Sequence, residues 1–442
     1  MAKGQIKVQC FQGDTYIPVE GCRVTVNPSS ANAQARTNYR ADLVTDSSGT
    51  TQSIEVEAPP MEYSQNPSNN APYSLYDIRV QRSGFEDVSI KNVQVFPERT
   101  ALQNVNLVQV SNTRASRADV IVVLPNTLFG DYPAKIPENV DKPLPPPSSG
   151  VVLPKPVIPE FITVHQGSPN DNTAPNYTVD YKDYIKNVAS CEIYSTWPES
   201  TIRANIFCII SFTLNRIYTE WYRGKGKNFD ITSSTAYDHA FNYGRNIYDS
   251  ISAVVDDIFS TYIRRYGRKQ PLLAQYCDGK NVTCPEWLSQ WGSKYLGDQG
   301  KVPYDILTYY YGDDIELTTA EQVKGSPISY PGYDLDIGSS GEPVKMVQEF
   351  LNRIAQNYPL IPKVAVDGVY GNATAQQVKV FQEVFNLPKT GIVDYATWYM
   401  ISDVYVGVSK IAELRSSNVF YPPESRNGYR GIEVPHFRYP VN

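Results

Sequence analysis

The chain has 442 residues, a formal net charge of −6, and 19% charged and 41% hydrophobic residues. A chain of this length exceeds one ordinary domain, so we expect two to four domains. The pI is about 5.3 and the sequence has no basic block, which argues against a nucleic-acid partner. No run of about 18 apolar residues is present, so no membrane span is predicted. The 33 tyrosines suit carbohydrate-stacking surfaces and β-sandwich cores equally well.

Residues 4 to about 110 alternate between apolar and polar side chains with a period of two, as at Ile6, Val8 and Cys10. Short alternating stretches separated by turn residues predict a single β-sandwich domain. Cys10 and Cys22 both fall on the inward-facing phase, which favours small core residues over a disulfide between them. No set of catalytic residues is visible in this region, so we interpret it as a structural, targeting or inhibitory module.

A proline-rich stretch follows over residues 113–160. Nine prolines lie between Asp131 and Glu160, and such a run favours extended polyproline geometry over helix or sheet. Two interpretations stay open. The stretch is a plain spacer, or it is an exposed tether whose extended backbone a protease can bind.

Glu192 is the candidate for chemistry in the central part of the chain. The sequence around it predicts two helices broken by a turn, because Tyr184, Val188 and Cys191 form one apolar face and Pro198 suits the first turn of a second, buried helix. Glu192 would then end the first helix beside a rigid core, where a raised pKa lets a carboxyl group donate a proton. On pattern alone, a solvated or ion-paired glutamate is the commoner outcome.

The motif around Glu192 resembles the signature of the SpoIID family, which are lytic transglycosylases of sporulating bacteria. The residues that carry the resemblance are 183–184, Glu192 and 197–199, at the mutual spacing of the signature. In that family the glutamate is the catalytic acid and base, and the resemblance implies this role for Glu192. Residues 289–292 and 300–312 also follow the family's order, so the resemblance covers residues 161–318 and implies an α+β catalytic domain.

The resemblance also suggests where substrate would bind. Ser289 and Gln290 would form hydrogen bonds with sugar hydroxyl or acetamide groups, and Asp238 is the nearest candidate for a second carboxylate, which would make hydrolysis feasible. The other candidate substrate-binding residues are aromatic: Tyr194, Trp197, Tyr237 and Trp291.

This sequence departs from the family in the segments that often carry zinc ligands. In this sequence those segments are residues 234–239 and 284–287, which lack the family's zinc-ligand pattern, so no metal site and no cofactor is predicted. Cys277, Cys284 and His239 form the alternative zinc-ligand set, although their spacing is not diagnostic.

Residues 336–404 predict a small domain of three helices. Their pattern resembles the three-helix peptidoglycan-binding domain, whose hallmark is matched by residues 366–374 and 381–382. Gly368 and Gly371 are expected to supply positive φ in a tight turn of this domain. Asp394 is expected to cap the third helix, and residues 405–442 form a tail without periodicity.

Together these features predict a multidomain α+β protein whose domain order resembles the clostridial spore cortex-lytic enzymes of the SleC type. The resemblance implies a proenzyme with a transthyretin-like β-sandwich prodomain, cut by a subtilisin-like serine protease at germination. The cut is expected near Ser149, Gly150, Val151 and Val152. The chain begins without the apolar core of a signal peptide, so we expect assembly into the spore, in the cortex or outer layers, by another route. The predicted domains are 1–112 (prodomain), 113–160 (linker), 161–318 (catalytic), 336–404 (peptidoglycan-binding) and 405–442 (tail).

The implied reaction is lytic transglycosylation of cortex peptidoglycan, in which Glu192 acts first as acid and then as base and leaves a 1,6-anhydro product. Two other classes stay open: a non-catalytic peptidoglycan-binding protein or amidase enhancer, and a zinc hydrolase.

Overall fold

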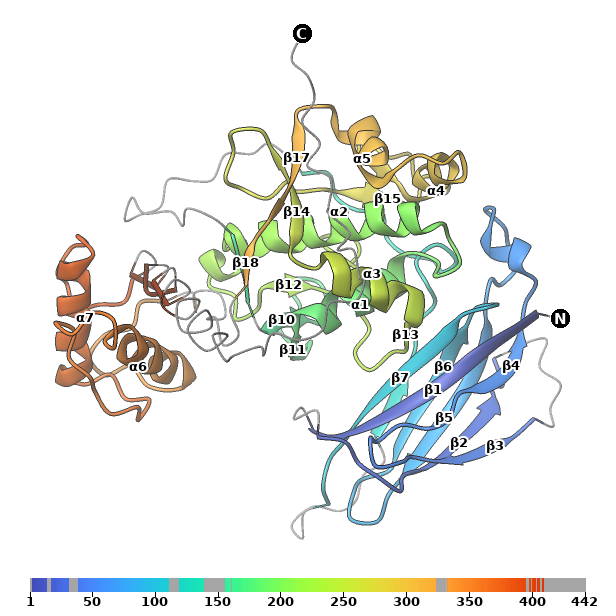
Figure 1. The fold of residues 1–442 in the computed structure, drawn as a ribbon, viewed down its shortest axis with the longest axis horizontal. Coiled ribbons are helices and arrows are strands. Elements are labelled where there is room, and N and C mark those ends of the chain that lie inside the picture. The colour runs from blue at the N-terminus through green and yellow to red at the C-terminus, as the bar shows by residue number, and fades with distance from the viewer. Residues whose placement is uncertain are drawn as a thin grey trace, which may run out of the picture.

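The computed structural model shows a mixed α+β protein in which sheets, a central helical body and a C-terminal pair of helices follow one another along the chain (Figure 1). The structure describes residues 2–13, 17–31, 39–110, 119–138, 156–159, 161–322, 331, 333–394, 397–398, 400–402, 404–405 and 408.

Two sheets with mixed strand directions form the N-terminal part. One has the order β13-β7-β1-β4 and the other β3-β2-β5-β6-β8. Ile6, Val8 and Cys10 are fully buried, so the predicted two-residue alternation is confirmed; Cys10 and Cys22 are buried free thiols. The strands are β1 (Ala2–Gln12), β2 (Arg23–Pro28), β3 (Ala41–Val44), β4 (Ile54–Ala58), β5 (Ser74–Gln81), β6 (Val88–Val95), β7 (Thr100–Leu107) and β8 (Asp119–Val122), with the 3₁₀ helix η2 (Met61–Ser64) after β4.

The strands at one edge of each sheet differ from the sequence prediction. β8 lies inside the predicted linker, yet it pairs in parallel with β6 and covers an otherwise open edge. β13 (Ile247–Tyr248) belongs to the central part of the chain, but it pairs with β7. The N-terminal sheets and the central part are therefore joined by backbone hydrogen bonds.

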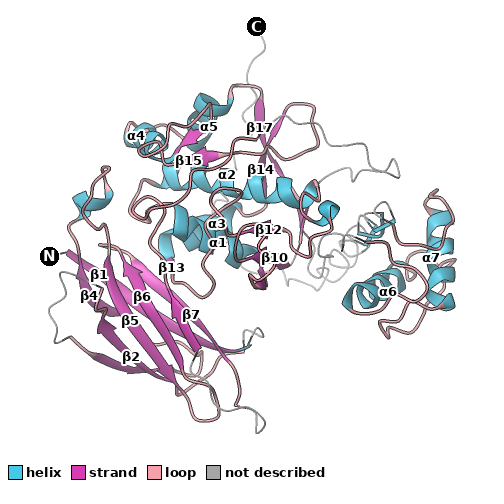
Figure 2. Cartoon of the chain, turned by 180° about the vertical axis from the view of Figure 1, so that it is seen from behind, coloured by secondary structure: helices cyan, strands magenta, loops and turns pink. Residues whose placement is uncertain are grey.

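Helix α2 (Glu199–Tyr218) runs through the middle of the central part (Figure 2). All but three of its 20 residues are buried, and buried polar side chains such as Asn205 and Arg216 form hydrogen bonds with neighbouring elements. It packs against the helices α1 (Tyr181–Glu192), α3 (Asp249–Ile258), α4 (Gln290–Asp298) and α5 (Pro303–Tyr311). The short strands around it are β9 (Val157–Ile158), β10 (Phe161–His165), β11 (Asn176–Asp180), β12 (Ile231–Thr232), β14 (Thr261–Arg265), β15 (Tyr276–Cys277), β16 (Leu288–Ser289), β17 (Ile315–Thr319) and β18 (Glu321–Gln322), with the 3₁₀ helix η3 (Arg223–Lys225) after α2.

The C-terminal helices α6 (Glu342–Ile354) and α7 (Asn372–Val384) enclose a separate apolar core. Gly368 has a φ of 71°, as predicted. Gly371 has a φ of −98°, so its predicted positive φ is wrong; it is the extended residue that begins α7. The Asp394 carboxylate accepts a hydrogen bond from the Thr397 backbone N–H at 2.8 Å, which confirms the predicted cap.

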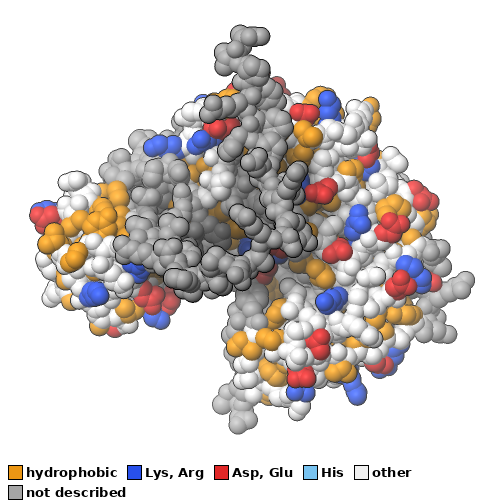
Figure 3. Space-filling view, viewed as in Figure 1, with side chains coloured by type: hydrophobic (Ala, Val, Ile, Leu, Met, Phe, Trp, Pro, Cys, Tyr) orange, Lys and Arg blue, Asp and Glu red, His pale blue; other side chains and the backbone are white. Residues whose placement is uncertain are grey.

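Among the described residues, no helix has both the length and the apolar character that a membrane crossing needs. Figure 3 shows Lys and Arg side chains interspersed with Asp and Glu on the face drawn. No gathering of basic side chains is visible on that face.

Candidate active site

Glu192 is the last residue of α1, and both ends of this helix are well defined. At the start, the Asp180 carboxylate accepts hydrogen bonds from the backbone N–H groups of Lys182 and Asp183 at 2.8 and 3.2 Å, an N-cap arrangement. At the end, Ile193 turns to extended geometry. Because α1 packs against α2 and α3, the position of Glu192 is set by buried elements.

The Glu192 carboxyl group is buried, with 4% of the residue exposed. Its Oε1 accepts a hydrogen bond from the Ala240 N–H at 2.7 Å, and its Oε2 accepts one from the Thr127 hydroxyl at 3.0 Å. The Gln290 side chain donates to the Glu192 backbone carbonyl at 2.9 Å. Burial raises the pKa of Glu192, and the positive charge of Lys135 opposes this shift. A raised pKa keeps the proton on the acid at higher pH, as a general acid requires.

A cavity of about 70 Å³ lies against Glu192. Ligand sites usually enclose about 300–1,000 Å³, so the space is too small for a disaccharide in this state. The Tyr276 hydroxyl is buried beside the carboxyl group without a hydrogen bond of normal geometry among the described residues. The walls of the cavity are formed by Thr127, Tyr132, Pro133, Ala134, Lys135, Glu192, Thr235, Tyr276, Cys277, Asp278, Val282 and Gln290.

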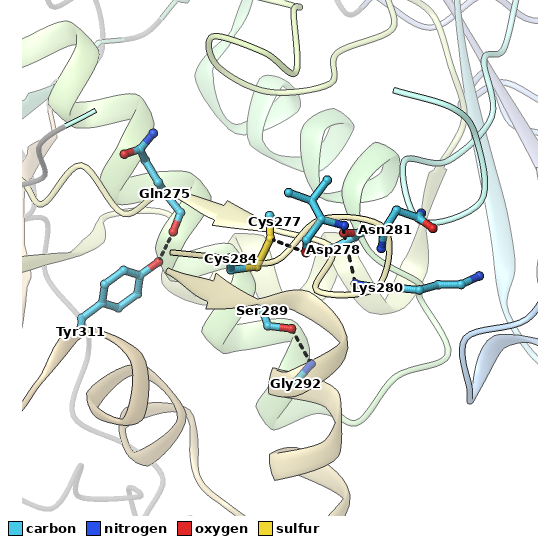
Figure 4. Close-up of a disulfide and its surroundings, with 10 residues drawn as sticks. Gln275, Cys277, Asp278, Lys280, Asn281, Cys284, Ser289, Gly292 and Tyr311 are labelled. Atoms are coloured by element: carbon cyan, nitrogen blue, oxygen red, sulfur yellow. Dashed lines mark hydrogen bonds between the residues drawn. A yellow bond between two sulfur atoms is a disulfide. The ribbon is translucent and has the colours of Figure 1, made fainter. Parts of the chain in front are cut away.

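Of the predicted substrate-binding residues, only Gln290 lines this cavity. Ser289 caps α4, since its hydroxyl accepts a hydrogen bond from the Gly292 N–H at 3.0 Å (Figure 4). Tyr194, Trp197 and Trp291 form a buried cluster with ring centroids 5.0 to 5.7 Å apart. None of the three rings lines the cavity. Tyr194 packs against Phe96 with 5.2 Å between ring centroids, and the Trp197 indole N–H donates to the Ser64 carbonyl at 2.9 Å.

Asp238 does not face Glu192 across the cavity, which corrects the expected second carboxylate. It is fully buried and forms an ion pair with Arg216 at 2.8 Å. Its other oxygen accepts hydrogen bonds from the Tyr222 hydroxyl at 2.7 Å and from Thr232. Tyr237 contributes its backbone carbonyl, which accepts a hydrogen bond from Arg216 at 3.1 Å. These contacts make Asp238 a structural partner of Arg216.

Cys277 and Cys284 form a disulfide (Figure 4), so their sulfur atoms are bonded to each other and are not thiolate ligands. His239 Nδ1 lies 3.1 Å from the Tyr184 hydroxyl. The alternative zinc-ligand set is therefore not assembled. Within the part of the chain that the structure describes, no group of three or more His, Cys, Asp or Glu side chains is arranged to hold a metal ion.

The cavity contains residues that sequence reasoning missed. Thr127 and Lys135 come from the predicted linker, and nothing in their local sequence indicates a site. Asp278 is a carboxylate on the cavity wall, but its oxygens accept hydrogen bonds from the backbone N–H groups of residues 280–282. The sequence around Asp278 suggests only a turn. The predicted cleavage residues 149–152 lie outside the described residues.

Comparison with known proteins identifies the C-terminal domain. Residues 340–401 match the family model whose description reads "Putative peptidoglycan binding domain". No curated protein matches the chain. The match supports a cell-wall-related protein with a peptidoglycan-binding domain near its C-terminus.

Among solved structures, the N-terminal domain of SleB is similar, with 32% identity over 16% of this chain and 93% of that chain and a TM-score of 0.15. The TIE protein of Bacillus anthracis has 15% identity over 25% of this chain and 17% of that chain, with a TM-score of 0.17. The minor pilin GBS52 of Streptococcus agalactiae has 15% identity over 26% of this chain and 48% of that chain, with a TM-score of 0.16.

Proposed function

We propose that this protein is a lytic transglycosylase of spore cortex peptidoglycan, made as a proenzyme and activated by proteolysis at germination. The observation that carries the proposal is the environment of Glu192: a buried carboxyl group with a raised pKa at the end of a rigid helix, beside a cavity. The match of residues 340–401 to a peptidoglycan-binding family supplies the substrate class.

In the proposed reaction, protonated Glu192 donates its proton to the glycosidic oxygen between N-acetylmuramic acid and N-acetylglucosamine. The bond from the muramic acid C1 to that oxygen breaks, and the C6 hydroxyl of the same sugar attacks C1. Glu192, now a carboxylate, accepts the hydroxyl proton, and a 1,6-anhydro sugar is left. Because the nucleophile belongs to the substrate, one carboxyl group suffices where ordinary glycosidases use two.

Hydrolysis is the second candidate, because Asp278 lines the same cavity as Glu192. In an inverting hydrolase a second carboxylate activates water. The Asp278 oxygens already accept three hydrogen bonds from the backbone of their own loop, which is typical of a residue that stabilises a turn. We therefore favour the transglycosylase.

The test is mass spectrometry of cortex fragments released by the full chain after it has been cut within the proline-rich stretch. Anhydro ends support the transglycosylase, and reducing ends support the hydrolase. Glu192→Gln should abolish release, whereas Glu199→Gln, at an exposed glutamate paired with Arg203, is the matched control and should not. Release that persists in Glu192→Gln would refute the proposal, and the absence of release from every form would leave a wall-binding protein or amidase enhancer.

A further inference from the structure

Residues 126–138 include five residues of the wall of the Glu192 cavity, Thr127 and 132–135, and we call them the cleft segment. They follow β8 within the proline-rich stretch 113–160, and they belong neither to the N-terminal sheets nor to the helices of the central part. They contact the central part at both ends and in the middle, and each contact involves a side chain or backbone group at the candidate site.

The first contact covers the Glu192 carboxyl group. The Asn126 side chain donates hydrogen bonds to the carbonyls of Ser190 and Ile193 at 3.2 and 3.1 Å. The Thr127 N–H donates to the Cys191 carbonyl at 2.9 Å, and the Thr127 hydroxyl donates to Glu192 Oε2 at 3.0 Å. The segment therefore uses a hydrogen-bonding position on Glu192 that a glycosidic oxygen would need.

The second contact places a charge inside the cleft. The Lys135 ammonium group donates to the Asp238 backbone carbonyl and lies 4.9 and 5.1 Å from the ring centroids of Phe212 and Tyr276. Burial lowers the pKa of Lys135 to about 8. The positive charge of Lys135 and the Thr127 hydrogen bond both lower the pKa of Glu192. Both contacts therefore oppose the rise that burial causes in the pKa of Glu192, without reversing it.

The third contact anchors the far end of the segment. Glu138 forms a forked ion pair with Arg216, with N–O distances of 2.5 and 3.1 Å. Gln275 accepts a hydrogen bond from the Glu138 N–H and donates one to the Ile136 carbonyl, both at 3.1 Å. The Ile136 N–H donates to the Ala236 carbonyl at 2.7 Å. A forked arginine–carboxylate pair is among the stronger polar contacts in proteins.

We propose that the cleft segment is an internal plug that occupies the glycan-binding groove and keeps Glu192 inactive until the segment leaves. This inference rests on the proposed function and deepens it, because it assigns inhibition to residues 126–138 and not to the N-terminal sheets. The small volume of the cavity supports it, since Thr127, Lys135 and residues 132–134 form one side of the space. Their departure opens that side to the surface.

The plug also explains why a cut beyond residue 138 would activate the enzyme. Such a cut frees the C-terminal end of the segment but leaves its other end joined to the N-terminal sheets through β8. Two contacts between the central part and the N-terminal part must then break: the pairing of β13 with β7, and the hydrogen bond from the Trp197 indole N–H to the Ser64 carbonyl. Once they break, the sheets and the plug leave together.

The experiment uses the uncut full chain with charge reversals in the segment. Glu138→Lys places a cation against Arg216, and Lys135→Glu places an anion beside Glu192. Asp131→Lys, at an exposed residue of the same segment, is the matched control. Each change replaces an attraction between the segment and the central part by a repulsion between like charges. Each reversal should therefore raise cortex-fragment release by the uncut chain about tenfold or more, while Asp131→Lys should leave it at the wild-type level.

Hydrogen exchange of the Thr127 and Ile136 amides provides a readout that does not depend on activity. We expect slow exchange in the wild type and in Asp131→Lys, and fast exchange in the two reversals and after cutting. Fast exchange without any gain in release, in a chain that is active once cut, overturns the plug, as does slow exchange in the cut chain. If no form releases fragments, the proposed function fails, and exchange after cutting still decides whether the segment leaves the cleft.

Discussion

The Asp238–Arg216 pair is the most heavily buried ion pair at the candidate site, and replacing Asp238 tests whether it serves structure or chemistry. Both side chains are at most 1% exposed. Asp238 accepts hydrogen bonds from Arg216 Nε at 2.8 Å, the Tyr222 hydroxyl at 2.7 Å, and the N–H and hydroxyl of Thr232 at 2.9 and 2.6 Å. In Asp238→Asn, the side-chain NH₂ group would face hydrogen-bond donors, and Glu138 would be the remaining carboxylate partner of Arg216 in the described part of the chain.

Breaking a buried pair by removing one partner costs about 3–5 kcal/mol. Because Arg216 keeps Glu138 as a partner, we expect the lower end of this range for Asp238→Asn, about 3 kcal/mol. The matched control is Asp256→Asn, which removes a carboxylate paired with Lys186 at the surface, where the aspartate side chain is 49% exposed. A surface pair of this kind contributes about 0–1 kcal/mol.

Urea unfolding, monitored by tryptophan fluorescence, measures how much each variant lowers the free energy of unfolding. Trp221 reports on the site because its ring centroid lies 4.7 Å from the Arg216 guanidinium group. With a slope of about 1–3 kcal/mol per molar urea, the unfolding midpoint of Asp238→Asn should fall by about 1 M or more. The midpoint of Asp256→Asn should hardly move. If Asp238→Asn has the same urea midpoint as the wild type but loses glycan cleavage, the reasoning is refuted and this carboxylate acts in the reaction.

Three further predictions concern other parts of the molecule. Because burial raises the pKa of Glu192 in the uncut chain, the acid form persists above the usual range for glutamic acid and is lost as the pH rises through the raised pKa. Difference infrared titration of the uncut chain against Glu192→Gln should therefore find the carboxyl proton lost above the ordinary value, and a loss near the ordinary value would contradict this. Six cysteines include four free thiols, so thiol titration of the unfolded protein, purified without reductant, should find four, and a value of six would exclude the disulfide. Gly368→Ala places a Cβ at positive φ, 3.3 Å from the Gly341 carbonyl oxygen. Thermal unfolding of the C-terminal domain should therefore show a loss of about 1–2 kcal/mol in its free energy of unfolding. The control Gly371→Ala, at φ −98°, should leave that free energy almost unchanged.

Local patterns were sufficient to predict several elements. The alternation at Ile6, Val8 and Cys10 predicted buried strand residues, and the apolar stripe from Ile202 predicted a buried helix; both are confirmed. The turn between α1 and α2 follows from a local signal as well, because Pro198 comes directly before α2. These signals act within one or two helical turns, so a linear reading can detect them.

The composition of the site was beyond such a reading. Thr127 reaches Glu192 across 65 residues of sequence, and Gln290 reaches it across 98. Asp238 and the aromatic residues around Trp197 have the chemistry that sugar binding needs, but ion pairing and packing place them elsewhere. β13 shows the same limit, because its partner strand β7 comes from a distant part of the sequence.

The order of residues thus specifies the strands, the helices and a glutamate at a helix end, because these depend on hydrogen bonds and apolar spacing along a short stretch of backbone. The chain's three-dimensional packing decides that Glu192 is desolvated, that Asp238 neutralises Arg216, and that residues 126–138 lie over the carboxyl group. Burial and charge pairing join segments that are distant in sequence, and their energies exist only once those segments meet.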